Sequence, residues 1–74
     1  MMTPEAIRER LVAALPGAVV EVADTTGGGD HFEVAVRSAA FAGKTLVEQH
    51  QLVYGALGAL MADIHALSLR TAAS

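Results

Sequence analysis

The sequence predicts a small α+β domain with the element order α-β-β-α(α)-β, in which helices cover one face of a three-stranded mixed sheet. Three observations lead to this prediction. Two segments have apolar residues at helical spacing, three short segments alternate between apolar and polar residues, and Gly- or Pro-containing stretches separate them. A strand–helix–strand connection within one sheet normally joins parallel strands. We therefore expect the third strand to run parallel to the second, and the first two to be antiparallel.

The first predicted element is a helix that begins at Thr3-Pro4-Glu5 and ends at Pro16-Gly17. The threonine can cap the first free amides, the proline suits the first helical position, and the glutamate suits the positive end of the helix dipole. One apolar stripe follows at positions i, i+4, i+7 and i+8. It consists of Ile7, Leu11, Ala14 and Leu15.

The next two elements are predicted strands, over Ala18 to Asp24 and over His31 to Ser38. The segment between them contains three consecutive glycines and is typical of a turn. Together they predict a β-hairpin whose loop is longer than a tight two-residue turn. The polar side chains of the sheet should meet water on its other face. They are Glu21, Glu33, Arg37 and Arg70.

Residues Thr45 to Ile64 are predicted to be helical, because apolar positions recur with a helical period. These positions are Leu46, Val47, His50, Val53, Leu57, Leu60, Met61 and Ile64. Two glycines, Gly55 and Gly58, weaken the middle of this segment and allow a bend or a break. The residues from His65 to Thr71 alternate again and form the predicted third strand.

Composition restricts the range of functions. The 74 residues are expected to form one domain over residues 1–74, and a hydrophobic content of 53% is too high for a disordered chain. The absence of cysteine excludes disulfides, thiol catalysis and metal sites built from the chain's own thiolates. A net charge of −3 with scattered basic residues disfavours strong binding to a phosphate backbone. We expect a cytoplasmic protein that is neither membrane-bound nor an enzyme, since no spanning segment, signal peptide or activated nucleophile is visible.

Two motifs in the second half of the chain resemble the BolA family. The first is FAGKTLVEQHQLVYGAL at residues 41–57, and the second is IHALSL at residues 64–69. They occur in the order and with the gap of the family pattern, and the resemblance covers about residues 5 to 71. The hairpin loop is similar to that of the subgroup with a histidine, here His31, in place of a cysteine before the second strand. The resemblance implies a fold similar to the type II KH arrangement.

For function, the resemblance implies a non-catalytic partner of a monothiol glutaredoxin of the Cys-Gly-Phe-Ser type. In that family the two proteins share a 2Fe–2S cluster, which the cysteine and glutathione hold on the glutaredoxin side. The ligands from this chain would be His65 and His31, and the isolated chain would bind no cluster. The implied role is iron–sulfur trafficking or iron sensing. A dimerisation module without a metal, or a weak homodimer, is a further interpretation.

The two histidines suit this chemistry, because imidazole is a good ligand for iron and two imidazoles bind one iron in Rieske centres. If the second and third strands are parallel neighbours, both histidines begin a strand at the same edge of the sheet. Strict alternation, however, puts His65 on the helix side and His31 on the water side. The alternatives are a helix-capping histidine for His65 and a solvated loop residue for His31. His50, on the apolar stripe, is expected to be a core histidine with its hydrogen bonds satisfied.

The alternative function is a KH-like, nucleic-acid-binding transcriptional regulator of the stress response. Gly55-Ala56-Leu57-Gly58 spells the GxxG of KH domains, and Lys44 and Arg70 are the candidate contacts with DNA. This GxxG lies within a helical pattern and beside no basic residue, which favours close helix packing or a helix break. Gln49 stands where many members of the family have arginine, so part of the basic surface for DNA binding is missing.

Overall fold

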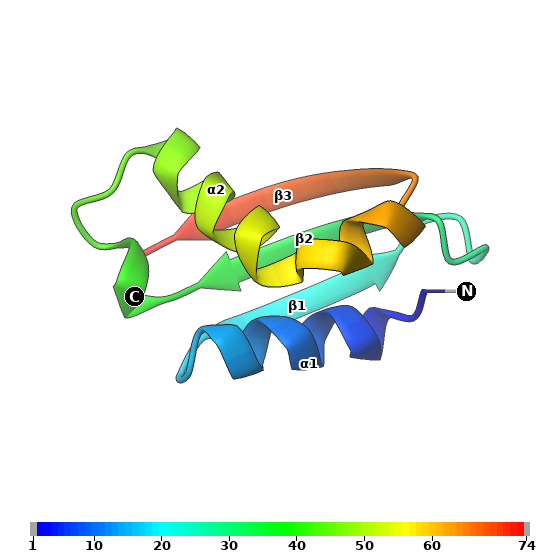
Figure 1. Cartoon of the computed structure of the whole chain (residues 1–74), viewed down its shortest axis with the longest axis horizontal. Helices are drawn as coiled ribbons and strands as arrows, with labels where there is room; N and C mark the ends of the chain where they lie inside the picture. The colour runs from blue at the N-terminus through cyan, green and yellow to red at the C-terminus, as the bar shows by residue number, and fades with distance from the viewer. Residues whose placement is uncertain (1, 74) are drawn as a thin grey trace.

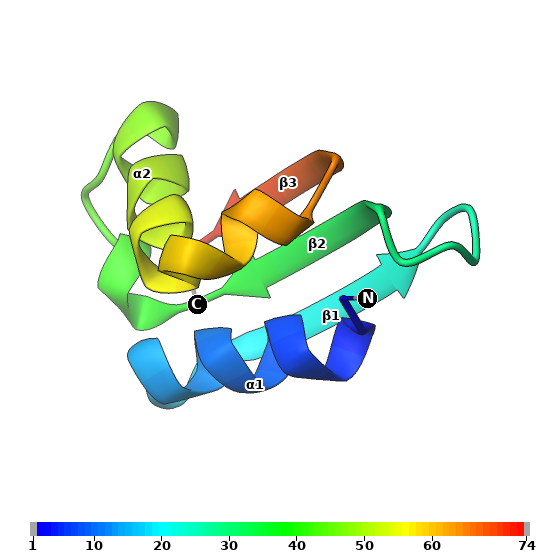
Figure 2. The same ribbon diagram turned by 45° about the vertical axis from the view of Figure 1, so that its right-hand side comes forward.

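Two helices lie against one face of a three-stranded sheet in the computed structural model, which describes residues 2–73 (Figure 1). Both views in ribbon form place α1 and α2 on the same side of the sheet (Figure 2). The elements are α1 Pro4–Ala14, β1 Val19–Asp24, β2 His31–Arg37, the 3-10 helix η1 Ala39–Phe41, α2 Leu46–Leu57, the 3-10 helix η2 Gly58–Asp63, and β3 Ala66–Ala72. The predicted α+β architecture is confirmed. No helix within the described residues is long and apolar enough to cross a membrane.

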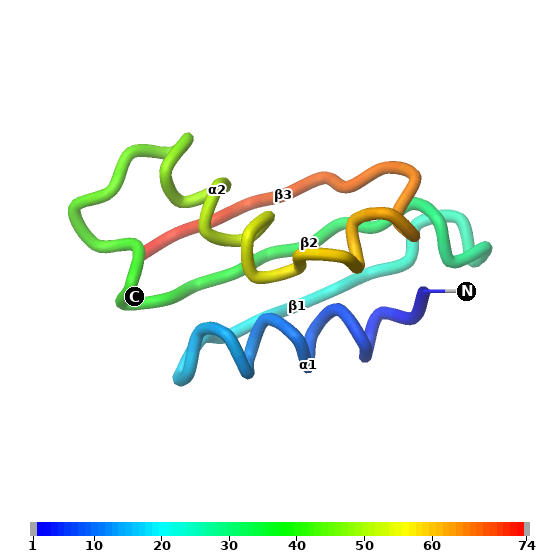
Figure 3. Tube along the Cα trace, viewed as in Figure 1, coloured from blue at the N-terminus to red at the C-terminus, as the bar shows by residue number. Residues whose placement is uncertain are grey.

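Strand β2 occupies the centre of the sheet, whose order is β1-β2-β3. It pairs with β1 in antiparallel fashion, with Val20 opposite Val36. It pairs with β3 in parallel, from His31 opposite Ala66 to the far end of both strands. The chain can return to the starting edge of β2 only through a crossover, which η1, α2 and η2 provide (Figure 3).

The core lies between the helices and the sheet. Its members are Met2, Ile7, Leu11, Val20, Phe32, Val34, Val36, Phe41, Val53, Leu57 and Ile64. The opposite face of the sheet is open, and the four charged residues predicted to meet water there are all exposed. This division follows from the alternation of side chains along each strand, because every second residue points to the same face.

The second helix is shorter than predicted. It ends at Leu57, and Gly58, which has a φ of +54°, leads into the 3-10 helix η2. The Nε atom of Arg10 on α1 donates a hydrogen bond to the carbonyl oxygen of Ala56 at 3.1 Å. A carbonyl in the last turn of α2 thus finds a partner on the neighbouring helix, which ties the two helices together.

The first turn of α2 also departs from the prediction. Leu46 and Val47, which were expected on the buried stripe, are 61% and 65% exposed. The axis of α2 is inclined to the strands, so its second half lies over the sheet while its start projects beyond it (Figure 1). Burial is accordingly confined to Val53 and Leu57 within this helix.

A capping box begins α2. The Oγ1 atom of Thr45 accepts a hydrogen bond from the amide of Glu48 at 3.2 Å, and the Oε1 atom of Glu48 accepts one from the amide of Thr45 at 2.8 Å. The hydrogen bond from the Thr45 amide is the main reason why the pKa of Glu48 lies below its ordinary value. The box was not predicted, although the T-x-x-E spacing is its sequence signature.

The two glycines of the GxxG segment should respond to alanine in opposite ways. Gly55 lies inside α2 with nothing within 4 Å of an added Cβ, so Gly55→Ala should raise the free energy of unfolding by about 0.5–1 kcal/mol. Gly58 has a positive φ, so Gly58→Ala should lower it by about 1–3 kcal/mol. Urea unfolding of both variants measures the two effects, and a change of the same sign for both would contradict the assigned helix end.

Glu48 should make the free energy of unfolding depend on pH in the acidic range. Its pKa is lower in the folded chain than the ordinary value of 4.5, so its charge stabilises the fold above that pH. The contribution is lost as the pH falls through the folded pKa. Gln keeps an acceptor for the Thr45 amide, so we expect wild type and Glu48→Gln to differ in unfolding free energy at pH 7 and to converge in acid. Urea unfolding at a series of pH values tests this, and a gap that stays constant with pH would refute it.

Candidate functional site

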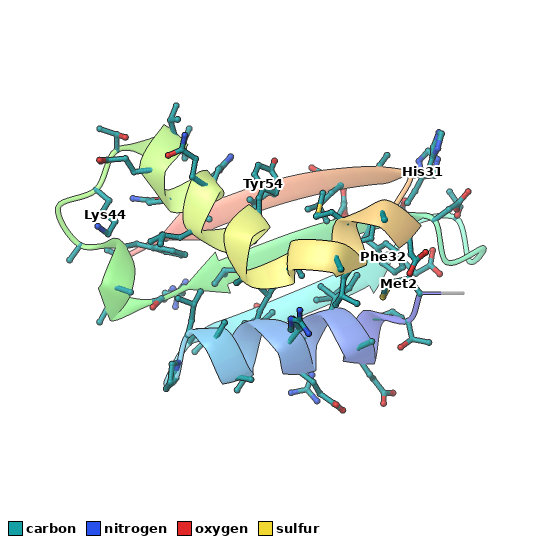
Figure 4. The ribbon with its side chains drawn as sticks, viewed as in Figure 1. Met2, His31, Phe32, Lys44 and Tyr54 are labelled. Carbon is teal, nitrogen blue, oxygen red and sulfur yellow. The ribbon has the colours of Figure 1, made fainter. Side chains whose placement is uncertain are left out.

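His31 and His65 meet at the edge of the sheet where β2 and β3 begin. Their ring centroids are 5.0 Å apart and the ring planes are inclined at 38°. His31 is partly exposed and His65 is exposed. His31 lies at the end of the molecule that carries the β1–β2 loop (Figure 4). The two residues predicted as metal ligands are therefore brought together, with both rings accessible from outside.

Backbone hydrogen bonds explain why the two rings meet. The amides of His65 and Ala66 both donate to the carbonyl oxygen of Asp30, at 2.8 and 3.0 Å. Strand β3 begins at Ala66, one residue later than predicted, and Ala66 is the partner of His31 in the parallel ladder. His65 therefore precedes the strand, and alternation along β3 does not fix its direction. The predicted conflict between the faces of the two histidines does not arise.

The loop before His31 is held by side-chain hydrogen bonds. The Asp24 carboxylate accepts from the amides of Thr26 and Gly27 at Oδ1, at 3.2 and 2.9 Å, and from the amide of Gly29 at Oδ2, at 3.0 Å. The Thr26 hydroxyl donates to Oδ1 of Asp30 at 3.0 Å. This network was not predicted. Its visible signal is an aspartate at the end of a strand followed by threonine and glycine, which is typical of side-chain-to-backbone turns.

Acidic groups add little to the histidine pair. The Oδ2 atom of Asp30 lies 4.0 Å from Nε2 of His31, beyond hydrogen-bond distance. Within residues 2–73, no three His, Asp or Glu side chains are grouped so that they could hold a metal ion. The histidine pair can thus supply two nitrogen ligands, and a complete coordination shell requires ligands from another molecule.

His50 differs from the prediction. It is half-buried on α2, and its Nε2 atom is enclosed but has no hydrogen-bond partner in the part of the chain that the structure describes. Its ring meets that of Tyr54 edge to face, with centroids 6.4 Å apart. The residue is therefore not a satisfied core histidine. It belongs to α2 and not to the strand ends that carry the histidine pair.

Gln49, the position where many family members have arginine, has a structural role. Its Nε2 atom donates to the carbonyl oxygen of Lys44 at 3.0 Å, and its Oε1 atom accepts from the hydroxyl of Thr71 at 2.6 Å. It thereby connects the start of α2 to the end of β3.

The two candidate contacts with DNA lie in different surroundings. Arg70 lies on the open face of the sheet, where Glu21 and Glu33 line the same hollow. Lys44 precedes α2 and lines a separate hollow with Glu48. Each basic side chain thus has acidic neighbours, which weakens its attraction for a phosphate backbone.

The GxxG segment is part of the core helix. Gly55 lies within α2, and Leu57 is completely buried. A KH loop grips phosphates with exposed backbone between two helices. The segment here ends α2 at Leu57, so the predicted helix break is observed. Close packing at Gly55 is not observed, because nothing lies within 4 Å of a Cβ added there.

The fold and the histidine pair define a class: a two-layer α+β domain that presents two imidazoles at one edge of a mixed sheet. A model of the family "BolA-like protein" matches residues 8–74, and the chain therefore belongs to this family. The predicted family resemblance is confirmed.

Known proteins of this family resemble the chain along most of its length. Protein BOLA2 of Arabidopsis thaliana is 44% identical over 73 residues, which is 97% of this chain and 78% of the relative. The crystal structure of a Bol-like protein from Babesia bovis superposes with a TM-score of 0.87 at 31% identity, covering 99% of this chain and 86% of that one. The solution structure of yeast Fra2 superposes with a TM-score of 0.79 at 30% identity, covering 95% and 77%.

Two neighbouring residues of α2 should respond oppositely to leucine. His50→Leu removes an enclosed nitrogen without a partner and should raise the free energy of unfolding by about 1 kcal/mol. Gln49→Leu removes the bridge between Lys44 and Thr71 and should lower it by about 1 kcal/mol. Thermal and urea unfolding measure both changes. A loss of stability in His50→Leu would contradict the expectation.

Proposed function

We propose that this chain is a non-catalytic partner of a monothiol glutaredoxin of the Cys-Gly-Phe-Ser type, and that it helps to hold a shared 2Fe–2S cluster for iron–sulfur trafficking or iron sensing. The observation that carries the proposal is the pairing of His31 and His65, whose ring centroids are 5.0 Å apart at an accessible edge of the sheet. Membership in the BolA-like family supports it. We further infer from His31 that the chain belongs to the subgroup with a histidine in this loop.

The donor set suits the proposed cargo. Neutral imidazole nitrogens are good iron ligands, and two imidazoles on one iron of a 2Fe–2S cluster are the arrangement of Rieske centres. The chain has no cysteine, so ligands for the second iron have to come from the partner. The glutaredoxin cysteine and glutathione would supply them. No residue of this chain needs to act as a catalyst in this role.

The surroundings of the pair leave space for a partner. A hollow of about 300 Å³ adjoins His31, between the starting ends of β2 and β3. Its lining includes the small residues Ala66 and Ser68 beside Glu33. Small side chains beside the His31 imidazole allow another molecule to approach it closely.

The proposal is tested by mixing the chain with a Cys-Gly-Phe-Ser glutaredoxin, glutathione, iron and sulfide without oxygen, and by recording visible absorption and circular dichroism. We expect His65→Ala to remove the histidine-dependent features and His31→Ala to weaken them, because loop glycines let another ligand replace His31. Both variants should keep the wild-type melting temperature, since neither ring is in the core.

His50→Leu is the matched control, because it removes a histidine outside the pair and should leave the spectrum unchanged. The chain without glutaredoxin should form no stable cluster. A stoichiometric cluster on the chain alone, or a wild-type spectrum from His65→Ala, would overturn the assignment. Binding to duplex DNA that weakens steeply with added salt would favour the nucleic-acid alternative instead.

A further inference from the structure

We propose that Asp24 is a positioning residue for the histidine pair: its carboxylate holds the β1–β2 loop, residues 25–30, in the shape that keeps His31 beside His65. This inference rests on the proposed function and deepens it. Asp24 is the last residue of β1, and its carboxylate binds loop amides, so it would act through the loop and not as an iron ligand.

The carboxylate of Asp24 is the acceptor for several backbone amides of the loop. Three backbone amides, those of Thr26, Gly27 and Gly29, donate to its two oxygens at distances between 2.9 and 3.2 Å. Asp24 is half-buried and Gly29 is buried. Hydrogen bonds to an ionised acceptor are stronger than those between neutral groups, and a buried amide without a partner is costly. The clamp therefore gives a loop with three glycines one preferred shape.

Hydrogen bonds transmit this shape to both histidines. The amide and the hydroxyl of Thr25 donate to the carbonyl oxygen of His31, at 3.0 and 3.3 Å. The Thr26 hydroxyl holds the side chain of Asp30 at 3.0 Å. The carbonyl oxygen of Asp30 then accepts from the amides of His65 and Ala66. The last residue of the loop is thus the point at which the backbone of His65 is attached to the hairpin.

Only a carboxylate satisfies all three amides. In Asp24→Asn, the single amide oxygen can still accept from Thr26 and Gly27, but an NH₂ group then faces the amide of Gly29, so that two donors oppose each other. Asp24→Ala removes every acceptor. We expect the asparagine variant to release the Gly29 end of the loop, next to Asp30, and the alanine variant to release the whole loop.

The experiment compares Asp24→Asn and Asp24→Ala with Glu21→Gln. Glu21 lies on the same strand, and its replacement removes the same charge from the exposed face. In the free chain, NMR measures the exchange of the Gly29 amide and the nuclear Overhauser effect between the ring protons of His31 and His65. With glutaredoxin, glutathione, iron and sulfide, circular dichroism gives the chain concentration that produces half of the histidine-dependent signal.

Both Asp24 variants should show faster exchange at Gly29, a weaker ring-to-ring Overhauser effect and a half-maximal concentration about tenfold higher, as expected for the loss of one or two hydrogen bonds. Glu21→Gln should match wild type in all three. An unchanged Overhauser effect and half-maximal concentration in the Asp24 variants would overturn the proposal. So would a weakened signal that follows only the unfolded fraction, measured by urea unfolding of the same samples.

Failure of a variant to fold, and failure of the proposed function, can each be distinguished from failure of the proposal for Asp24. If Asp24→Ala does not fold, Asp24→Asn alone tests the role of Asp24. The asparagine variant is expected to fold, because it keeps two of the three hydrogen bonds. If wild type gives no histidine-dependent signal with glutaredoxin, the proposed function fails. The amide exchange and the Overhauser effect in the free chain then decide by themselves whether Asp24 holds the pair together.

Discussion

The parallel pairing of β2 with β3 is the interaction on which the rest of the structure depends. It begins at His31 opposite Ala66, and the Asp30 carbonyl that accepts both the His65 and the Ala66 amides closes its first end. A parallel pair requires the chain to travel back along the sheet, and the helix that does so covers the core. The same pairing places the starting ends of both strands at one edge. The fold and the histidine pair are therefore consequences of one ladder.

Much of this fold could be predicted from the sequence, because its elements follow simple periodic rules. Alternation identified the three strands, and the crossover rule fixed the parallel direction of β3. The same rules could not predict the exposure of Leu46 and Val47. Helical period shows which residues share a face, but it does not show how much of the helix lies over the sheet. That depends on the inclination of α2, which tertiary packing sets.

The site was predicted in part. The resemblance and the positions of His31 and His65 at strand starts indicated the pair, and the structure brings the two rings together. Their relative direction was not predictable by alternation, because β3 begins at Ala66 and His65 lies outside the strand, where the alternation of faces does not apply. The hydrogen bonds of Asp24 and the enclosed Nε2 atom of His50 depend on the three-dimensional positions of individual polar atoms. A residue pattern carries no such information.

The two histidines belong to parts of the chain that the whole crossover connection separates, and this has a thermodynamic consequence. In the unfolded chain, bringing them together costs the entropy of closing a long loop, so the pair exists only when the complete domain is folded. Any ligand that binds both imidazoles at once therefore stabilises the entire domain, by an amount that grows with ligand concentration. For a small domain, such a ligand would also reduce the unfolded fraction that proteases can cleave.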